Sequence, residues 1–148
     1  MFKSVYIILL SCFITCSVYA QDSISYKNKV DSILISRSKV PAKKKTLRLY
    51  TLRVRYFISR KTGELYLIEV AEQKGKELVI YNYHYIDDEL TMISKHQSLP
   101  HKDIRIEKVF YYFKNNSLFF KVGNSAPIDD LNYHVQYAQK LKANAPSN

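Results

Sequence analysis

The chain has 148 residues, of which 47% are hydrophobic and 24% charged, and it contains three Gly and four Pro. This length fits one compact domain, and this composition excludes a collagen-like chain, a disordered tail and a low-complexity scaffold. The chain carries 23 Lys and Arg against 13 Asp and Glu, a formal net charge of +10, which favours negatively charged partners.

The first twenty residues have the layout of an export signal. Lys3 supplies a positive start, residues 5–14 form an apolar core, and residues 18–20 resemble a cleavage site. The apolar run is too short and too polar to cross a bilayer. We therefore predict a signal peptide over residues 1–20, cleavage after Ala20, and a periplasmic or secreted mature protein.

Both cysteines of the chain, Cys12 and Cys16, lie within this signal. The mature chain would then have no disulfide and no thiolate. An alternative is that the stretch ending at Cys12 is a lipoprotein processing site, in which Cys12 would be acylated, although Leu10 departs from the small residue usual before such a cysteine.

The next segment, residues 21–46, predicts a helix followed by a basic connector. Apolar residues recur at steps of three and four, the spacing of a helix stripe, at Tyr26, Val30, Ile33 and Leu34. We expect this helix to end near Ser36. Residues 38–45 contain Pro41 and three adjacent lysines, which predict an exposed, protease-sensitive connector.

The positive charge is concentrated near the start of the mature chain. Residues 27–61 contain a single acid, Asp31, whereas the chain from Thr62 onward is near neutral. Such asymmetry creates a local field that speeds association with anions. The alternative is a solvated basic face that only aids solubility.

Residues 47–125 predict an antiparallel β-meander of about six strands. From Leu47 the apolar period changes to two, which indicates one strand running to a hairpin loop at Gly63. The predicted register pairs Val54 with Val70, Tyr56 with Ile68, Ile58 with Tyr66, and, on the opposite face, Arg55 with Glu69. It places Tyr81 and Tyr83 on the face of Ile68.

Later turns are predicted at Gly75, at Asp87 and Asp88, and at Asn115 and Asn116. Residues 126–148 predict a helix and tail, with acids at the helix start and an apolar stripe at Leu131, Val135, Ala138 and Leu141. The fold class is therefore α+β, with an N-terminal helix, a meander and a C-terminal helix in one domain over residues 21–148.

The last hairpin has aromatic residues on both predicted faces, with Phe120 beside Tyr111 and Phe113, and Phe119 beside Phe110 and Tyr112. Two helices covering one side of a sheet would require only one apolar face. The surplus indicates a second covered surface or an exposed aromatic platform, unless it reflects strand propensity and cross-strand pairing alone.

The export signal, the opening helix and the aromatic hairpins with Leu after a polar turn resemble small exported meander-sheet proteins of Gram-negative bacteria. The pattern is also similar to cystatin-like and inhibitor-like folds, in which a helix packs across a curved antiparallel sheet. The resemblance implies a fold and a compartment, and it brings no functional residue to this sequence.

Residues for catalysis or metal binding form no recognised pattern. His96 and His101 with Asp103 match no common ligand spacing, His84 is expected opposite the tyrosines as an ordinary histidine, and the acids at 87–89 suit a turn better than a calcium loop. No nucleophile or phosphate-loop motif is present. We expect no enzyme activity, no cofactor and no metal.

Two functions remain. The first is a binding or inhibitory domain that holds an anionic protein or glycan through Arg48, Tyr50, Arg53, Phe57, Arg60 and Lys61, because Arg and Tyr most often carry interface energy. The second is a carrier that encloses a lipid or other apolar ligand. A nucleic acid is not the partner we expect, because no recognition motif is present and an exported protein rarely meets one.

Overall fold

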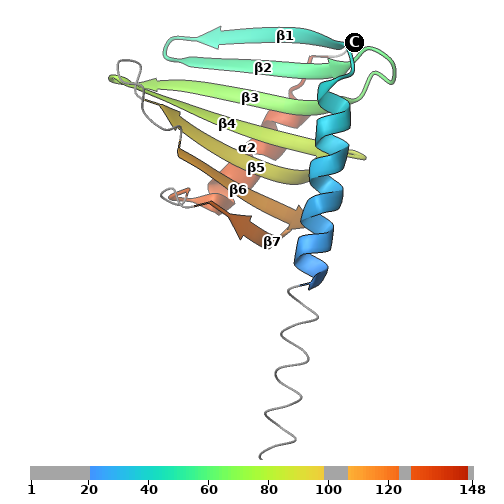
Figure 1. Ribbon diagram of the computed structural model, residues 1–148. Helices are drawn as coiled ribbons and strands as arrows, with labels where there is room; N and C mark the ends of the chain where they lie inside the picture. Colours follow the sequence, from blue (N-terminus) through green and yellow to red (C-terminus); the bar gives the residue numbers. More distant parts are fainter. Residues whose placement is uncertain (1–20, 99–106, 124–127, 147–148) are drawn as a thin grey trace, which may run out of the picture.

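The computed structural model describes residues 21–98, 107–123 and 128–146, which form two helices and one sheet. The α+β class is confirmed. The N-terminal helix spans residues 21–38, and the sheet is a seven-stranded antiparallel meander in the order β1 to β7 (Figure 1). The remaining elements are β1 (Ala42–Leu49), β2 (Leu52–Ser59), β3 (Leu65–Lys74), β4 (Glu77–Ile86), β5 (Glu89–Ser98), β6 (Glu107–Lys114), β7 (Ser117–Val122) and α2 (Leu131–Ala143).

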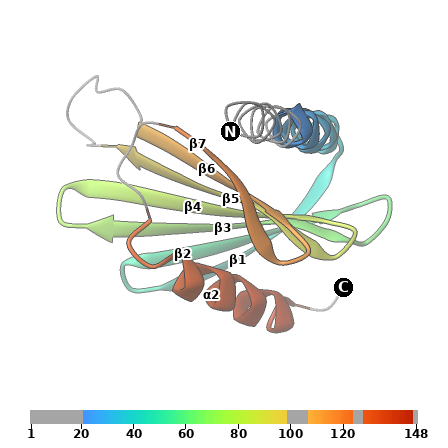
Figure 2. The same ribbon diagram turned by 90° about the horizontal axis from the view of Figure 1, so that it is seen from below.

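The two helices lie on opposite faces of the sheet, so the domain has three layers (Figure 2). This arrangement differs from a sheet with both helices on one side, which would need a single apolar face. The residues under each helix form a separate apolar cluster. The second cluster accounts for the surplus of aromatic residues, because strands β5 and β6 have buried residues on both faces.

The larger cluster lies between the sheet and α2. The expected alternation of β2, β3 and β4 is confirmed: Tyr56, Ile68, Val70 and Tyr83 are buried on this face, and Tyr81 packs against them. The apolar stripe of α2 completes the cluster at Leu131, Val135, Ala138 and Leu141. Two tyrosine hydroxyls tie the helix to the sheet: Tyr83 bonds His134 Nδ1 at 2.7 Å, and Tyr85 donates to the Ala138 carbonyl at 2.8 Å.

The smaller cluster lies between the sheet and the N-terminal helix. Val30 of the helix is buried against Met92 and Tyr112, and Tyr26 and Leu34 pack around them as the helix stripe predicts. The Arg37 guanidinium donates to the Tyr85 carbonyl at 2.9 Å near the other end of the helix. These contacts place the helix across the strands from β6, at Tyr112, to β4, at Tyr85.

Two β-bulges correct the predicted registers. Val54 with Val70, Tyr56 with Ile68 and Arg55 with Glu69 are confirmed as partners, but a shift after Phe57 places Ile58 opposite Leu65 and not Tyr66. A second shift between Tyr112 and Phe113 makes Phe120 the partner of Tyr112. Phe120 therefore lies on the face of the N-terminal helix, opposite to the face predicted from strict alternation.

The start of the sheet also differs from the prediction. Residues 43–45 belong to strand β1 and not to an exposed connector, and the single strand expected from Leu47 is a hairpin. The chain reverses at Tyr50, whose φ is 48°. The strand was not predicted because its three lysines look like a solvated linker in sequence. Lysines are nevertheless common on edge strands, where their side chains stay in solvent.

The other turns form where the sequence places them. Gly63 and Gly75 have positive φ, and so do both residues of the Asp87 and Asn115 turns. Asp130 caps α2 by accepting the backbone N–H of Tyr133 at 2.8 Å. Among the described residues, no helix combines the length and the apolar character needed to span a membrane.

Candidate functional site

The predicted binding residues lie on and beside the β1–β2 hairpin. We use the name basic hairpin for β1, β2 and the loop that follows β2, with the basic residues Lys43, Lys44, Lys45, Arg48, Arg53, Arg60 and Lys61. All of these except Lys45 and Arg53 are exposed. The hairpin forms one edge of the sheet, as Figure 1 shows at the top.

The structure brings two of the predicted arginines directly together. Arg48 of β1 is the cross-strand partner of Arg53 of β2, so the two side chains lie on the same face of the sheet. The Arg53 Nε atom is buried and has no hydrogen-bond partner. Two like charges opposite each other destabilise a sheet, and a buried unpaired donor has an additional cost.

Several basic residues of the hairpin differ from those elsewhere in the domain in their ion pairs: Lys43, Lys44, Arg48, Arg53, Arg60 and Lys61. Among the described residues, ion pairs join Lys27 to Asp31, Arg37 to Asp87, Arg55 to Glu69, Lys74 to Glu72 and Lys142 to Asp88. None of these six residues takes part in them. Arg55 lies on the same strand, β2, but Glu69 neutralises it.

The two predicted aromatic residues have different environments. Tyr50 is fully exposed at the β1–β2 turn. Phe57 is half-buried, with its ring centroid 6.4 Å from that of Tyr66 and the Lys44 ammonium 5.3 Å from its own centroid. Tyr50 can therefore contact a partner directly, whereas Phe57 positions Lys44.

The predicted residues form two groups and not one patch. Arg48, Tyr50 and Arg53 lie at the turn between β1 and β2, whereas Arg60 and Lys61 lie in the loop after β2. Arg53 and Arg60 are seven positions apart along the strand, about 23 Å at about 3.3 Å per residue. A partner that contacts both groups must be extended.

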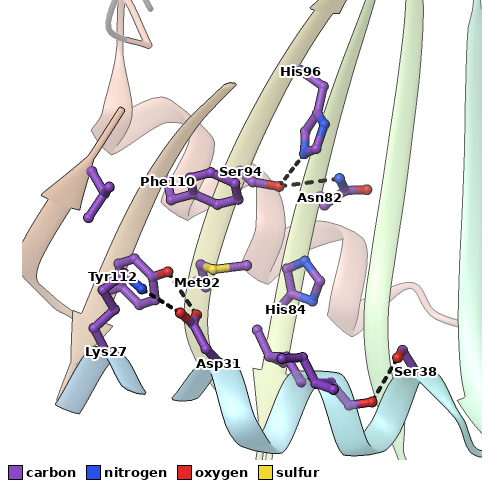
Figure 3. A pocket seen from close by; sticks show the side chains of 13 residues that line it. Lys27, Asp31, Ser38, Asn82, His84, Met92, Ser94, His96, Phe110 and Tyr112 are labelled. Atoms are coloured by element: carbon purple, nitrogen blue, oxygen red, sulfur yellow. Dashed lines mark hydrogen bonds and ion pairs between the residues drawn. The ribbon is translucent and has the colours of Figure 1, made fainter. Parts of the chain in front are cut away.

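A second candidate site is a groove between the N-terminal helix and the sheet (Figure 3). Its volume is about 580 Å³, within the range of small-molecule sites. Leu34 and Ile35 line it from the helix, and the strands contribute apolar residues that include Met92, Phe110 and Val122.

Polar side chains also line this groove. Ser94 Oγ accepts a hydrogen bond from Asn82 Nδ2 at 3.2 Å and bonds His96 Nε2 at 3.1 Å. Where the helix meets the sheet, Asp31 accepts hydrogen bonds from the Tyr112 hydroxyl at 2.8 Å and the Lys27 ammonium at 2.6 Å. The sheet thus contributes neutral donors and acceptors, and the helix contributes two charged groups, Lys27 and Asp31, that pair with each other.

The histidines of the groove are held in the neutral form. Burial, and then the neighbouring His96, lower the pKa of His84 to about 4. Burial also lowers the pKa of His96, and Lys108 lowers it further. No described residue hydrogen-bonds the His84 ring, so its two ring nitrogens offer one donor and one acceptor to the groove.

His84 lies on the face opposite the tyrosines, as predicted, but the groove that it lines was not predicted. The lining comes from the helix and four strands, and alternation alone does not bring those elements together. His101 and Asp103 of the considered metal site lie outside the described residues. His134 packs on α2 with its ring 4.3 Å from that of Tyr81, in a structural position.

Comparison of the chain with models of protein families, with curated proteins and with solved structures found no match.

Proposed function

We propose that this protein is an exported, non-enzymatic binding domain that holds an anionic protein or glycan through its basic hairpin. In this proposal the domain acts in the periplasm or outside the cell. The partner supplies negative charge for those basic residues of the hairpin that take part in none of the ion pairs described above.

The observation that carries the proposal is the pairing of Arg48 with Arg53. Folding alone gives no reason to place two arginines opposite each other, because the pair repels and leaves a buried Nε donor without an acceptor. A bound carboxylate, sulfate or phosphate would offset the repulsion between the two guanidinium groups. Guanidinium groups recognise such anions with two parallel hydrogen bonds.

The spacing of the basic groups supports an extended partner. Arg60 and Lys61 continue the positive surface beyond the far end of β2, and Lys43 and Lys44 lie between the two groups along β1. A chain of negative charges that follows the hairpin would meet a basic side chain along most of its length. Tyr50 adds an exposed aromatic contact at one end.

Replacement of Arg48 by Glu tests the proposal, because it separates stability from binding. Arg48→Glu creates an opposite-charge cross-strand pair with Arg53, so the melting temperature should stay unchanged or rise. Affinity for polyglutamate or a sulfated oligosaccharide, measured by titration calorimetry, should fall at least tenfold. Binding by the unaltered protein should also weaken toward 0.15 M salt, where the screening length is about 8 Å.

Lys140→Glu is the matched control, since Lys140 is exposed on α2 and far along the chain from the hairpin. It makes the same change in net charge and should leave affinity nearly intact. Equal losses in the two variants would show that only total charge matters. Unchanged binding by Arg48→Glu would contradict the proposal.

The groove favours a second candidate function, the carriage of a small ligand with an apolar body. Its apolar lining suits an acyl chain or ring system, and the neutral side chains of Asn82, His84 and His96 suit an uncharged polar group. A charged head group beside Asn82, His84 and His96 would lose hydration, and the charges in the lining, Lys27 and Asp31, already pair with each other.

A series of ligands with one tail tests this second function. The alcohol 1-dodecanol should raise the melting temperature more than dodecanoate or dodecylamine. Ser38→Trp should block the effect, because Ser38 lines the groove. Ser36→Trp is the control: Ser36 is also exposed and also bonds a backbone carbonyl of its own helix, but it does not line the groove. No shift with any ligand would exclude the carrier function.

A further inference from the structure

The position of β1 at the edge of the sheet points to a more specific kind of partner for the basic hairpin. We infer that an extended acidic segment of another protein pairs with β1 and adds a strand to the sheet. This inference rests on the proposed function, and it chooses a polypeptide over a glycan. Such strand addition combines main-chain hydrogen bonds with side-chain contacts on both faces.

The geometry of β1 suits strand addition. Among the described residues, β1 is the last strand at its end of the sheet and pairs with β2 alone, so no described strand pairs with the N–H and C=O groups on its other side. All eight of its residues are in continuous register with β2, with no bulge, and its only nearby proline, Pro41, precedes the strand. β7, at the opposite edge, has six residues, and a bulge interrupts its pairing with β6.

The charges of β1 lie on both faces of the sheet. Lys44 and Arg48 lie opposite Phe57 and Arg53, on the face of the N-terminal helix. Lys43 lies opposite Ile58, on the face of α2. Because side chains alternate along a strand, an added strand with acids at neighbouring positions would meet opposite charge on both faces.

The same charges select against a second copy of this chain. Two β1 edges that paired with each other would bring lysines against lysines, and edge lysines commonly prevent such self-association. An acidic strand reverses the sign of every one of these contacts. Charge repulsion therefore disfavours the pairing of two β1 edges, and charge attraction favours the pairing of β1 with a negatively charged strand.

The test uses the purified protein and the acetylated, fluorescent peptide Val-Glu-Glu-Val-Val-Glu-Glu-Val. This peptide has the same sequence in both directions and carries two acids on each face of a strand. A second peptide has every backbone nitrogen methylated, which keeps the carboxylates and removes all main-chain donors. The parent should bind, by fluorescence polarisation, at least tenfold more tightly than the methylated peptide.

Hydrogen exchange locates the bound peptide. The parent peptide should slow exchange of the outward β1 amides and leave those of β7 unchanged. The double variant Lys44→Glu and Arg48→Glu should lose the binding, whereas Lys76→Glu with Lys140→Glu should keep it, because both control residues are exposed and lie outside the hairpin.

The outcomes separate this inference from the proposed function. Equal binding of the two peptides without protection of β1, but with loss in the Lys44 and Arg48 variant, would overturn strand addition and leave anion binding intact. A sulfated oligosaccharide that bound more tightly than the parent peptide would assign the hairpin to a glycan. No binding of the peptides or the oligosaccharide by the unaltered protein would overturn both.

Discussion

The Tyr112 hydroxyl donates a hydrogen bond to Asp31 Oδ1 at 2.8 Å, and this bond joins strand β6 to the N-terminal helix. The other Asp31 oxygen accepts the Lys27 ammonium at 2.6 Å, so one carboxylate holds both partners. Burial and this bond to Asp31 raise the pKa of Tyr112, which keeps the phenol protonated as the donor. The helix is thus fixed to the sheet by a polar contact beside the Val30 cluster.

Removing this contact should weaken helix docking. Tyr112→Phe should lower the free energy of unfolding by about 1 to 2 kcal/mol, since the bond is made to a charged acceptor. Urea denaturation of Tyr112→Phe, Asp31→Asn and the double variant measures the coupling. A coupling energy near zero would show that the bond adds nothing to docking.

The core contact of Ile68 should matter more than the ion pair beside it. Ile68 is fully buried, and Ile68→Ala should lower the free energy of unfolding by about 2 to 5 kcal/mol. The pair of Arg55 with its cross-strand partner Glu69 is partly exposed, so Glu69→Gln should cost at most about 1 kcal/mol. Equal small effects in denaturant titrations would disprove the buried position of Ile68.

Acidification should destabilise the domain through His84. Its pKa in the folded protein is about 4, against about 6.5 for an unperturbed histidine, so between these values the unfolded chain binds the additional proton. The free energy of unfolding should therefore keep the full contribution of neutral His84 above about pH 6.5 and decrease as the pH falls toward 4. His84→Gln should show a shallower fall, with part of the slope remaining because burial also lowers the pKa values of His96 and His134. NMR titration of the imidazole gives the pKa directly, and a value near 6.5 would contradict the prediction.

The exported form should begin at Gln21. The signal would remove both cysteines, so the mature protein should fold identically with and without reductant. Mass spectrometry of the exported protein checks the new N-terminus. An acylated Cys12 at that position would identify a lipoprotein instead.

Residue type and period were enough to predict strands β2 to β7 and much of their register, whereas β1 was missed. Alternation placed Tyr56, Ile68 and Tyr83 on one buried face, and it placed Arg55 opposite Glu69. The turns were readable because Gly63 and the Asn115 turn need positive φ, which few residues adopt. These features are local, so residue type and period are enough to predict them.

Contacts between elements far apart in the chain fix which side of the sheet each helix covers. Both helices have an apolar stripe, and a stripe does not specify the face on which it packs. For the same reason the groove could not be predicted, because Leu34 of the helix and residues of four strands line it together. The bulge after Tyr112 moved Phe120 to the other face, because one extra residue reverses strict alternation.

Pairing also decided the environment of the predicted binding residues. In sequence, Lys43 to Lys45 have the composition of a solvated linker, and only the presence of β2 as a partner makes them an edge strand. That pairing brings Arg48 opposite Arg53 and buries the Arg53 Nε atom. Composition gave the charge of this region, whereas its geometry depends on contacts between strands, which local residue preferences do not encode.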